Sequence, residues 1–250
     1  MCQYDGMATR ARRSQRRTEA LSRERIVENA VELLDSAGEG GLTFRALTER
    51  LATGPGAIYW HVANKSELLG AATEAVVAAA LAIEHAESAD SPQDEIRAVA
   101  LGLFHAIDEH PWLATQLSTQ LSSNPWGSVT PRIFESIGRQ VRALGVPEGS
   151  WFTSTSVLVH YILGAAGQNA ANSAYADGLG PEMDRTEFLD TVSKAWEALD
   201  PDEYPFTRAV ADQLREHNDR EQFLAGIDLV LSGITALQPA SRQPHTSPPA

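Results

Sequence analysis

The fold of this chain is decided by residues 43–69, which read TFRALTERL (43–51), ATGPGAIYWHVA (52–63) and NKSELL (64–69). Leucines four residues apart follow Thr43, a residue type that can cap a helix. Pro55 suits the first position of another short helix, where the amide hydrogen that proline lacks is not needed. Asn64 and Glu67 have the spacing of a capping box. The stretch therefore predicts two short helices and then the start of a longer one.

A further helix is expected before this stretch, with Ser22 as its N-cap. Apolar residues recur at helical spacing from Ile26 to Ala37, and the glycine-rich residues 38–41 are expected to end the helix. Short helices joined by a glycine-containing turn are typical of a helix-turn-helix. Such a motif lays one helix in the major groove of DNA while its neighbours contact phosphates.

The rest of the chain also repeats at helical spacing and lacks the alternation typical of strands, so we predict an all-α protein. The amino-terminal three-helix unit is followed by a larger helical region. Helices are expected at 92–109, 111–121, 130–144, 148–176 and 220–237. A polar, acidic segment leaves open whether helices lie at 184–199 and 206–216.

The composition is that of an ordinary globular protein, with 43% apolar and 21% charged residues in a chain of 250. No apolar stretch approaches the roughly 20 residues needed to span a bilayer. A single cysteine, Cys2, excludes a disulfide framework and a cysteine-rich zinc site. The first residues are basic rather than apolar, so we expect a cytoplasmic protein.

Charge is unevenly distributed along the chain. The formal net charge is −13, yet residues 1–70 hold ten basic and nine acidic residues, a net of +1. The remaining 180 residues hold ten basic and 24 acidic residues. This asymmetry predicts that the amino-terminal part contacts a polyanion.

Residues 22–69 resemble the TetR family of one-component bacterial transcriptional regulators. The resemblance rests above all on YWHV (59–62), followed by Asn-Lys and a Leu-Leu pair. It implies that Tyr59, His61 and Lys65 contact phosphates, and that Arg45 reads a base, for which arginine suits guanine. Thr43, Thr53 and Ala57 complete the expected DNA-binding residues. Because residues 53–57 carry few polar groups, we expect sparse direct readout and a contribution from DNA shape.

The other side chains of this region are expected to be structural. The apolar ones should form the core, namely Leu47, Leu51, Ile58, Val62, Leu68 and Leu69. We expect Trp60 to be packed rather than stacked on a base, and Glu49 with Arg50 to form an exposed, solvated pair. Ala52 replaces the glycine that is usual in the family's turn.

A weaker resemblance to the carboxy-terminal domain of the tetracycline repressors extends over the rest of the chain. It is carried by HYILG (160–164) and FLAGIDLVLSG (223–233). It implies a homodimer formed through helices around 148–176 and 220–237, although both helices might instead belong to an intramolecular core. The expected organisation is a flexible basic arm (1–21), a DNA-binding domain (22–69), a ligand-binding and dimerisation domain (70–237) and a disordered tail (238–250).

The effector is not identified by the sequence. Leu117, Gln168 and Leu81 stand near the positions at which the tetracycline repressors bind the drug and its magnesium, so that inducer, and any metal or cofactor, is not expected. Polar and aromatic residues available for another pocket are Phe104, His105, Gln116, Trp126, Trp151, Ser156, His160, Tyr161 and Asn169. An apolar cleft with a few placed polar groups is the usual form of such a site.

Two functions remain in competition. The first is a ligand-responsive regulator, expected to be a repressor, which binds a palindromic DNA operator as a homodimer and is released by a small-molecule effector. The second is a small-molecule-binding helical bundle with weak or no specific DNA binding. Catalysis is not expected, because the sequence has no zinc-protease motif, glycine-rich phosphate loop or nucleophile elbow. Effector, operator sequence and the choice between repression and activation are left open.

Overall fold

A computed structural model describes residues 21–84, 90–178 and 185–237, and its regular elements in these ranges are all helices. The all-α prediction is therefore confirmed. The expected basic arm, apart from Leu21, and the expected tail at 238–250 lie outside the described residues. No helix within the described ranges has the length and apolar character needed to cross a membrane.

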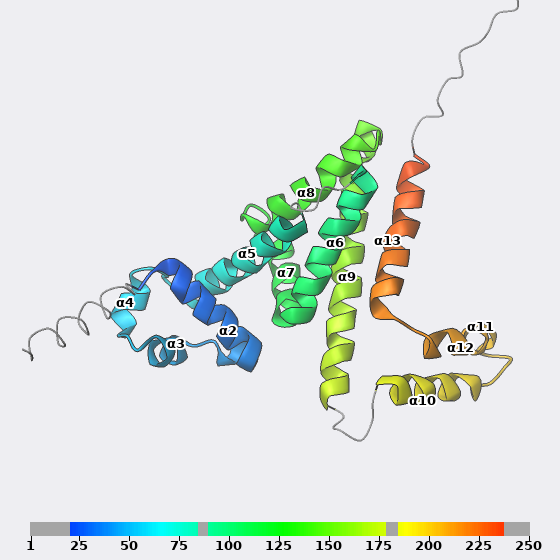
Figure 1. Cartoon of the computed structure of the whole chain (residues 1–250), viewed down its shortest axis with the longest axis horizontal. Helices are drawn as coiled ribbons and strands as arrows, with labels where there is room; N and C mark the ends of the chain where they lie inside the picture. The colour runs from blue at the N-terminus through cyan, green and yellow to red at the C-terminus, as the bar shows by residue number, and fades with distance from the viewer. Residues whose placement is uncertain (1–20, 85–89, 179–184, 238–250) are drawn as a thin grey trace, which may run out of the picture. The chain divides into compact units, whose positions relative to one another are not determined.

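The chain divides into two compact units, Met1–Ala75 and Val76–Ala250. The first contains α2 (Arg23–Gly41), α3 (Phe44–Leu51), α4 (Pro55–Tyr59) and the start of α5 (Lys65–Glu84). The second contains the end of α5 and the elements α6 (Pro92–Glu109), α7 (Trp112–Ser123), α8 (Val129–Ala143), the 3-10 helix η1 (Glu148–Ser150), α9 (Trp151–Gly178), α10 (Arg185–Glu197), α11 (Pro205–Ala209), α12 (Ala211–Arg215) and α13 (Asp219–Thr235) (Figure 1).

The helices of the first unit begin where local capping rules place them. The Ser22 hydroxyl accepts a hydrogen bond from the Arg25 amide at 3.2 Å. At the start of α5, Asn64 accepts from the Glu67 amide at 2.9 Å, and the Glu67 carboxylate accepts from the Ala63 amide at 2.8 Å. α2 is interrupted at Gly38, where the backbone angles are not helical (φ +62°, ψ −171°), within the glycine-rich residues expected to end it, and helical structure resumes as far as Gly41.

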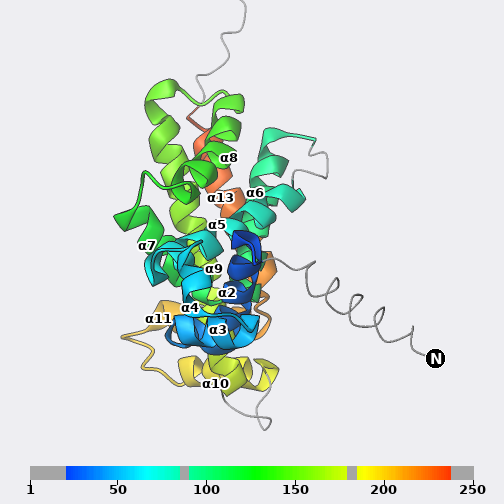
Figure 2. The ribbon, with the colours of Figure 1, turned by 90° about the vertical axis from the view of Figure 1, so that its left-hand side faces the viewer.

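α2, α3 and α4 pack around a small apolar core, and Figure 2 shows them side by side. The expected core residues Leu47, Ile58, Val62, Leu68 and Leu69 are buried, whereas Leu51 is only half-buried. From α2 the core receives part of the apolar stripe that the sequence predicted: Ile26, Ala30 and Leu34 are buried, whereas Leu33 is half-buried and Ala37 is exposed. Burying one face of each short helix is what holds them, because isolated helices of this length are marginal in water.

The second unit is built on α9, which packs against α6, α8 and α13. Figure 1 shows α6, α9 and α13 side by side. The core that α9 shares with α6 and α8 is apolar and consists of Ile96, Val99, Leu103, Ile107, Ile133, Ile137, Val141, Leu158, Val159, Ile162 and Ala166. Polar links add to this packing: Arg97 on α6 binds Asp228 on α13 at 2.7 Å, and Asn169 on α9 donates to Asp108 on α6 at 3.1 Å.

α9 and α13 approach each other closely at one glycine. The Tyr161 ring lies over Gly226, and its hydroxyl donates a hydrogen bond to the Phe223 carbonyl at 3.1 Å. A Cβ atom at position 226 would overlap the Tyr161 hydroxyl and ring carbons. The absence of a side chain at Gly226 therefore sets the spacing of the two helices at this point.

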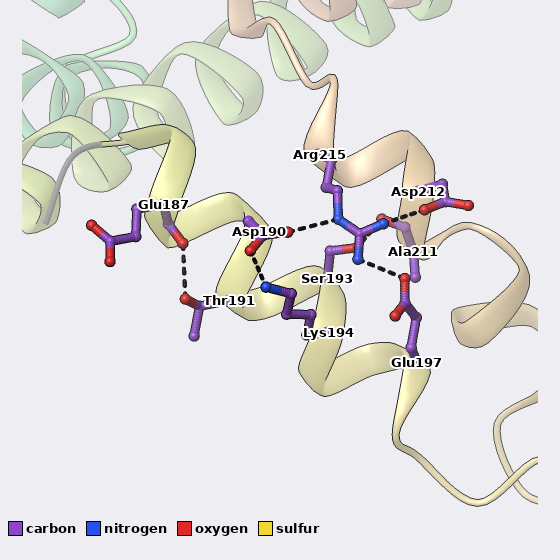
Figure 3. Close-up of polar contacts among 9 residues, drawn as sticks. All are labelled: Glu187, Asp190, Thr191, Ser193, Lys194, Glu197, Ala211, Asp212 and Arg215. Carbon is purple, nitrogen blue, oxygen red and sulfur yellow. Dashed lines mark hydrogen bonds and ion pairs between the residues drawn. The ribbon is translucent and has the colours of Figure 1, made fainter.

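Polar contacts join α10 to α12 (Figure 3). Arg215 binds Asp190 at 3.0 Å and Glu197 at 2.7 Å, and also pairs with Asp212. Lys194 binds Asp190 at 2.6 Å. Hydrogen bonds from Lys194 and Arg215 lower the pKa of the Asp190 carboxyl, and the bonds to Glu197 and Asp190 raise the pKa of Arg215.

The backbone between α11 and α12 corrects one open expectation. A helix was considered possible at 206–216, but the backbone at Val210 (φ −100°, ψ 2°) separates α11 from α12. Ser193 of α10 donates to the Ala211 carbonyl at 2.7 Å, and both residues are buried. The helix considered possible at 184–199 is present as α10.

Gly226→Ala should lower the free energy of unfolding by about 1–3 kcal/mol, because the new methyl group overlaps Tyr161 in a packed contact. Urea denaturation of the purified chain would measure the change. The matched control is Gly149→Ala in η1 of the same unit, an exposed position where a Cβ meets no atom within 4 Å. Adding Tyr161→Ala to the Gly226→Ala variant should relieve the overlap, so that strictly additive losses would contradict the proposed contact.

Candidate DNA interface and ligand pocket

α3 and α4 form the helix-turn-helix of the first unit. Thr43 caps α3 by accepting a hydrogen bond from the Ala46 amide at 3.1 Å. The turn after α3 passes through Ala52, which has left-handed backbone angles (φ 50°, ψ 44°). Glycine adopts this conformation without the steric cost that a Cβ brings, which explains why glycine suits this turn. Ala52 nevertheless makes the same turn.

The residues expected to bind DNA lie in α3, in α4, at the start of α5 and in the turns that flank α3 and α4. Four of them are exposed, and three are half-buried. The exposed ones are Thr43, Arg45, Ala57 and Tyr59, and the half-buried ones are Thr53, His61 and Lys65. The first unit thus gathers these side chains within two short helices and their flanking turns, although the hydroxyl of Thr43 already serves as a helix cap.

Arg45 is an exposed cation with a partner on its own helix. Its Nε donates to Glu49 Oε1 at 2.9 Å, one helical turn later. This hydrogen bond raises the pKa of the Arg45 guanidinium above its ordinary value. Because both side chains are exposed, the pair is weak and a base can replace the carboxylate.

Lys65 is engaged with the protein in this structure. Its Nζ donates to the backbone carbonyl of Glu39 at 2.6 Å, just beyond the kink of α2 at Gly38. A cation is favourable at the carboxyl end of a helix, where carbonyl groups lack amide partners. The ammonium therefore ties α5 to α2 within the first unit, and it has further hydrogens to donate to a phosphate.

The aromatic residues at the end of α4 correct one expectation. Tyr59 stacks on Phe44, with ring centroids 4.5 Å apart and planes 10° apart. Trp60, which was expected to be packed, is 87% exposed. The short helix turns only one face inward, and Ile58 and Val62 occupy it, so Trp60 points outward.

Glu49 and Arg50 are both exposed, as expected. The Arg50 guanidinium nevertheless has partners within the protein, since it pairs with Glu32 and binds Asn29 at 3.2 Å. Both partners belong to α2, so Arg50 links α3 to α2. In the structure, Arg50 therefore makes a contact between α2 and α3.

A pocket of about 240 Å³ lies in the second unit between α6, α9 and the start of α13. Three of the nine expected ligand residues line it: Phe104, Tyr161 and Asn169. The other lining residues are Ala165, Gln168, Asn172, His217, Asp219, Gln222 and Phe223. One wall is aromatic, since the Phe223 ring lies 4.6 Å from Phe104 and 5.8 Å from Tyr161 between centroids.

The polar side chains of this pocket already form hydrogen bonds and ion pairs within the protein. Gln168 donates to Asn172 at 2.9 Å, and His217 Nε2 lies 2.9 Å from Asp219 Oδ1. Arg185, at the start of α10, pairs with the other oxygen of Asp219. Burial raises the pKa of the Tyr161 phenol, whose hydrogen is donated to the Phe223 carbonyl.

Six of the expected ligand residues lie elsewhere. Gln116 is buried, Trp126 is 82% exposed, and Ser156 is half-buried. Trp151 donates to the Val146 carbonyl at 2.7 Å and carries the Arg142 guanidinium over its ring, which is a structural role. His105 and His160 are exposed. Leu117 and Leu81, which were expected to stand near the drug-binding positions of the tetracycline repressors, are buried core residues.

Apart from Asn169, the sequence interpretation did not assign the pocket's carboxamides, Gln168, Asn172 and Gln222, to a ligand site, and it missed the His217–Asp219 pair. Asn172 and Gln222 lie on exposed helix faces, where polar residues are ordinary. A usable signal existed at residues 217–219, where Asn218 caps α13 by accepting from the Glu221 amide at 3.0 Å. Recognising that cap would have placed His217 and Asp219 at the start of the helix.

Two family descriptions match the chain. "Bacterial regulatory proteins, tetR family" matches residues 26–72, and "Tetracyclin repressor-like, C-terminal domain" matches residues 86–238, more than half of the chain. Among solved structures, the transcriptional regulator SCO7222, a TetR protein from Streptomyces coelicolor, is 72% identical with a TM-score of 0.80. That match covers 88% of this chain and 100% of the other.

Curated relatives match mainly over shorter stretches. An HTH-type transcriptional regulator of Saccharopolyspora erythraea is 36% identical over 42% of this chain and 44% of its own length. The class C tetracycline repressor of Escherichia coli is 42% identical over 33% of this chain and 36% of its own length. The chain thus matches less than half the length of these two proteins. From the two matching domains and the SCO7222 structure together, the chain belongs to the TetR family of bacterial regulatory proteins.

Proposed function

We propose that this protein is a cytoplasmic, ligand-responsive transcriptional repressor that binds a palindromic operator as a homodimer. The observation that carries the proposal is the exposed surface of the helix-turn-helix, on which Arg45, Tyr59 and Trp60 lie together with the half-buried His61. Arginine grips base edges, and the phenol and imidazole suit phosphates. A regulatory role, rather than catalysis, accounts for this surface.

Trp60 is added to the proposed interface on the strength of its exposure. An indole that is 87% exposed at the end of α4 is costly to leave in water. Its position next to Tyr59 and His61 places it where a sugar or a thymine methyl group would cover it. Gly54, Pro55, Gly56 and Ala57 offer no polar side chains, so apolar contact and DNA shape would contribute more than usual to recognition.

The proposed dimer uses α9 and α13. Phe152 and Val157 on α9 and Leu229 on α13 are exposed apolar residues in a structure with a single chain. Large exposed apolar side chains on adjacent helices are typical of an interface between subunits. Gly164 and Gly233 are exposed on the same helices and would allow close approach.

Release by an effector requires that the ligand bind the conformation without operator more tightly than the operator-bound one. The pocket between α6, α9 and α13 is the proposed effector site. α5 is one continuous helix that starts in the first unit and ends in the second, so it is the proposed covalent route between ligand and DNA.

Selection of bound duplexes from a randomised DNA pool would test the proposal. We expect a palindrome, and an affinity for it that falls steeply as salt rises, because a basic surface displaces counterions from the phosphates. If the folded chain enriches no sequence, the alternative gains support: a small-molecule-binding bundle with weak or no specific DNA binding. The observation favouring that alternative is the lack of polar side chains at 54–57.

Arg45 and Lys65 should affect binding of the selected duplex in different ways. Arg45→Ala should relax one base position, at a cost of about 1–3 kcal/mol. Lys65→Ala should weaken all duplexes alike and reduce the salt slope by about 1. Fluorescence anisotropy on matched and singly mutated duplexes measures both effects, and thermal unfolding checks the contact of Lys65 with Glu39. Equal losses on every duplex from both variants would contradict the two roles.

Leu229→Asp should weaken the dimer at least tenfold, about 1.4 kcal/mol, because it would place a carboxylate in an apolar interface. Sedimentation over a range of protein concentrations measures the change. Phe206→Asp is the matched control, since Phe206 on α11 is 76% exposed, as is Leu229. A dimer that survives Leu229→Asp, or one that is lost with Phe206→Asp, would count against the proposed interface.

A further inference from the structure

The size of the pocket between α6, α9 and α13 limits what it can hold. At about 240 Å³ it is smaller than the roughly 300–1,000 Å³ typical of sites for drug-sized ligands. Its wall is formed by Phe104, Phe223 and Tyr161, whose rings lie against one another. Aromatic rings pack favourably on such a wall in offset or edge-on geometry. The space and the wall together suit one or two aromatic rings.

The charges around the pocket disfavour an ionised ligand. None of the ten lining residues is lysine or arginine, and the one lining imidazole, His217, already faces Asp219, so a bound carboxylate or phosphate would meet no unpaired cation. The one lining carboxylate, Asp219, has Oδ1 facing His217 and Oδ2 paired with Arg185. A ligand ammonium would have to displace these partners. Burying a charge without a partner is unfavourable, so neither sign is accommodated.

The remaining lining groups are uncharged and form hydrogen bonds. Gln168 and Asn169 use their amide nitrogens on Asn172 and Asp108, which leaves their carbonyl oxygens as acceptors for a ligand. Asn172 accepts through its oxygen, and its nitrogen can donate. A ligand that both donates and accepts would match this set.

From these observations, we propose that the pocket binds an uncharged compound of one or two aromatic rings that carries amide or hydroxyl groups. The rings lie against Phe104, Phe223 and Tyr161, and the polar groups bond to Gln168, Asn169 and Asn172. The identification of this compound as the effector rests on the proposed function. The site itself requires no DNA binding.

Three probes that share one naphthalene ring system separate charge from shape. Naphthalene-2-carboxamide is uncharged, 2-naphthoate is an anion, and 2-naphthylmethylammonium is a cation. Titration calorimetry with the full chain should give saturable binding of the carboxamide, at least tenfold tighter than either ion. Failure of the carboxamide to saturate, or an ion binding as tightly, would overturn the proposal.

Matched substitutions on α9 locate the binding. Ala165→Leu fills the pocket and should weaken carboxamide binding at least tenfold. Ala174→Leu adds the same atoms at an exposed position of the same helix and should leave binding unchanged. Asn172→Ala, at an exposed lining residue, removes the amide without filling the core and should weaken binding at least threefold. Unchanged binding in Asn172→Ala and in a folded Ala165→Leu would place the carboxamide elsewhere and refute the site.

These titrations contain no DNA, which keeps the two proposals distinguishable. A chain that binds the carboxamide but enriches no operator would retain the pocket and lose the proposed regulatory function. A chain that enriches an operator but binds no carboxamide would lose only the ligand class.

Discussion

The second unit depends on one close contact, in which Tyr161 of α9 lies across Gly226 of α13. The ring occupies space that any side chain at 226 would take, and its hydroxyl bonds the Phe223 carbonyl on the same helix. Tyr161 and Phe223 then continue as a wall of the pocket, next to Phe104. The spacing of two helices and the shape of the ligand site therefore have a common origin. The same arrangement leaves Leu229 on the outer side of α13.

Most of the fold was predictable because its signals are local. Ser22 and Asn64 cap the helices that the sequence assigned to them, and most of the apolar stripe predicted for α2 is buried. Capping and periodicity act within one or two helical turns, so a single sequence contains them. The exceptions are breaks without a strong sequence signal. Val210 separates α11 from α12, although no glycine or proline stands there.

The candidate sites were predicted less completely, because their residues meet others that are distant in sequence. Arg50 meets Glu32, and the pocket brings Gln168 together with Asp219, pairs that no local spacing reveals. The exposure of Trp60 depends on which neighbours fill the inner face of α4. For the expected DNA interface, the motif predicted the residues but not the groups within the protein that they contact. Lys65 on the Glu39 carbonyl is a contact between helices that only the tertiary structure shows.

The pair between Arg45 and Glu49 has a consequence for how sequences are discriminated. Glu49 competes with DNA bases for the Arg45 guanidinium, because its carboxylate lies one turn away on the same helix. A base that offers two good acceptors can take the guanidinium from it. A poorer base leaves the pair closed, and the guanidinium then stays neutralised by Glu49. If Arg45 reads a base as proposed, the helix would thus set an internal threshold, below which an approaching sequence meets a neutral pair instead of a cation.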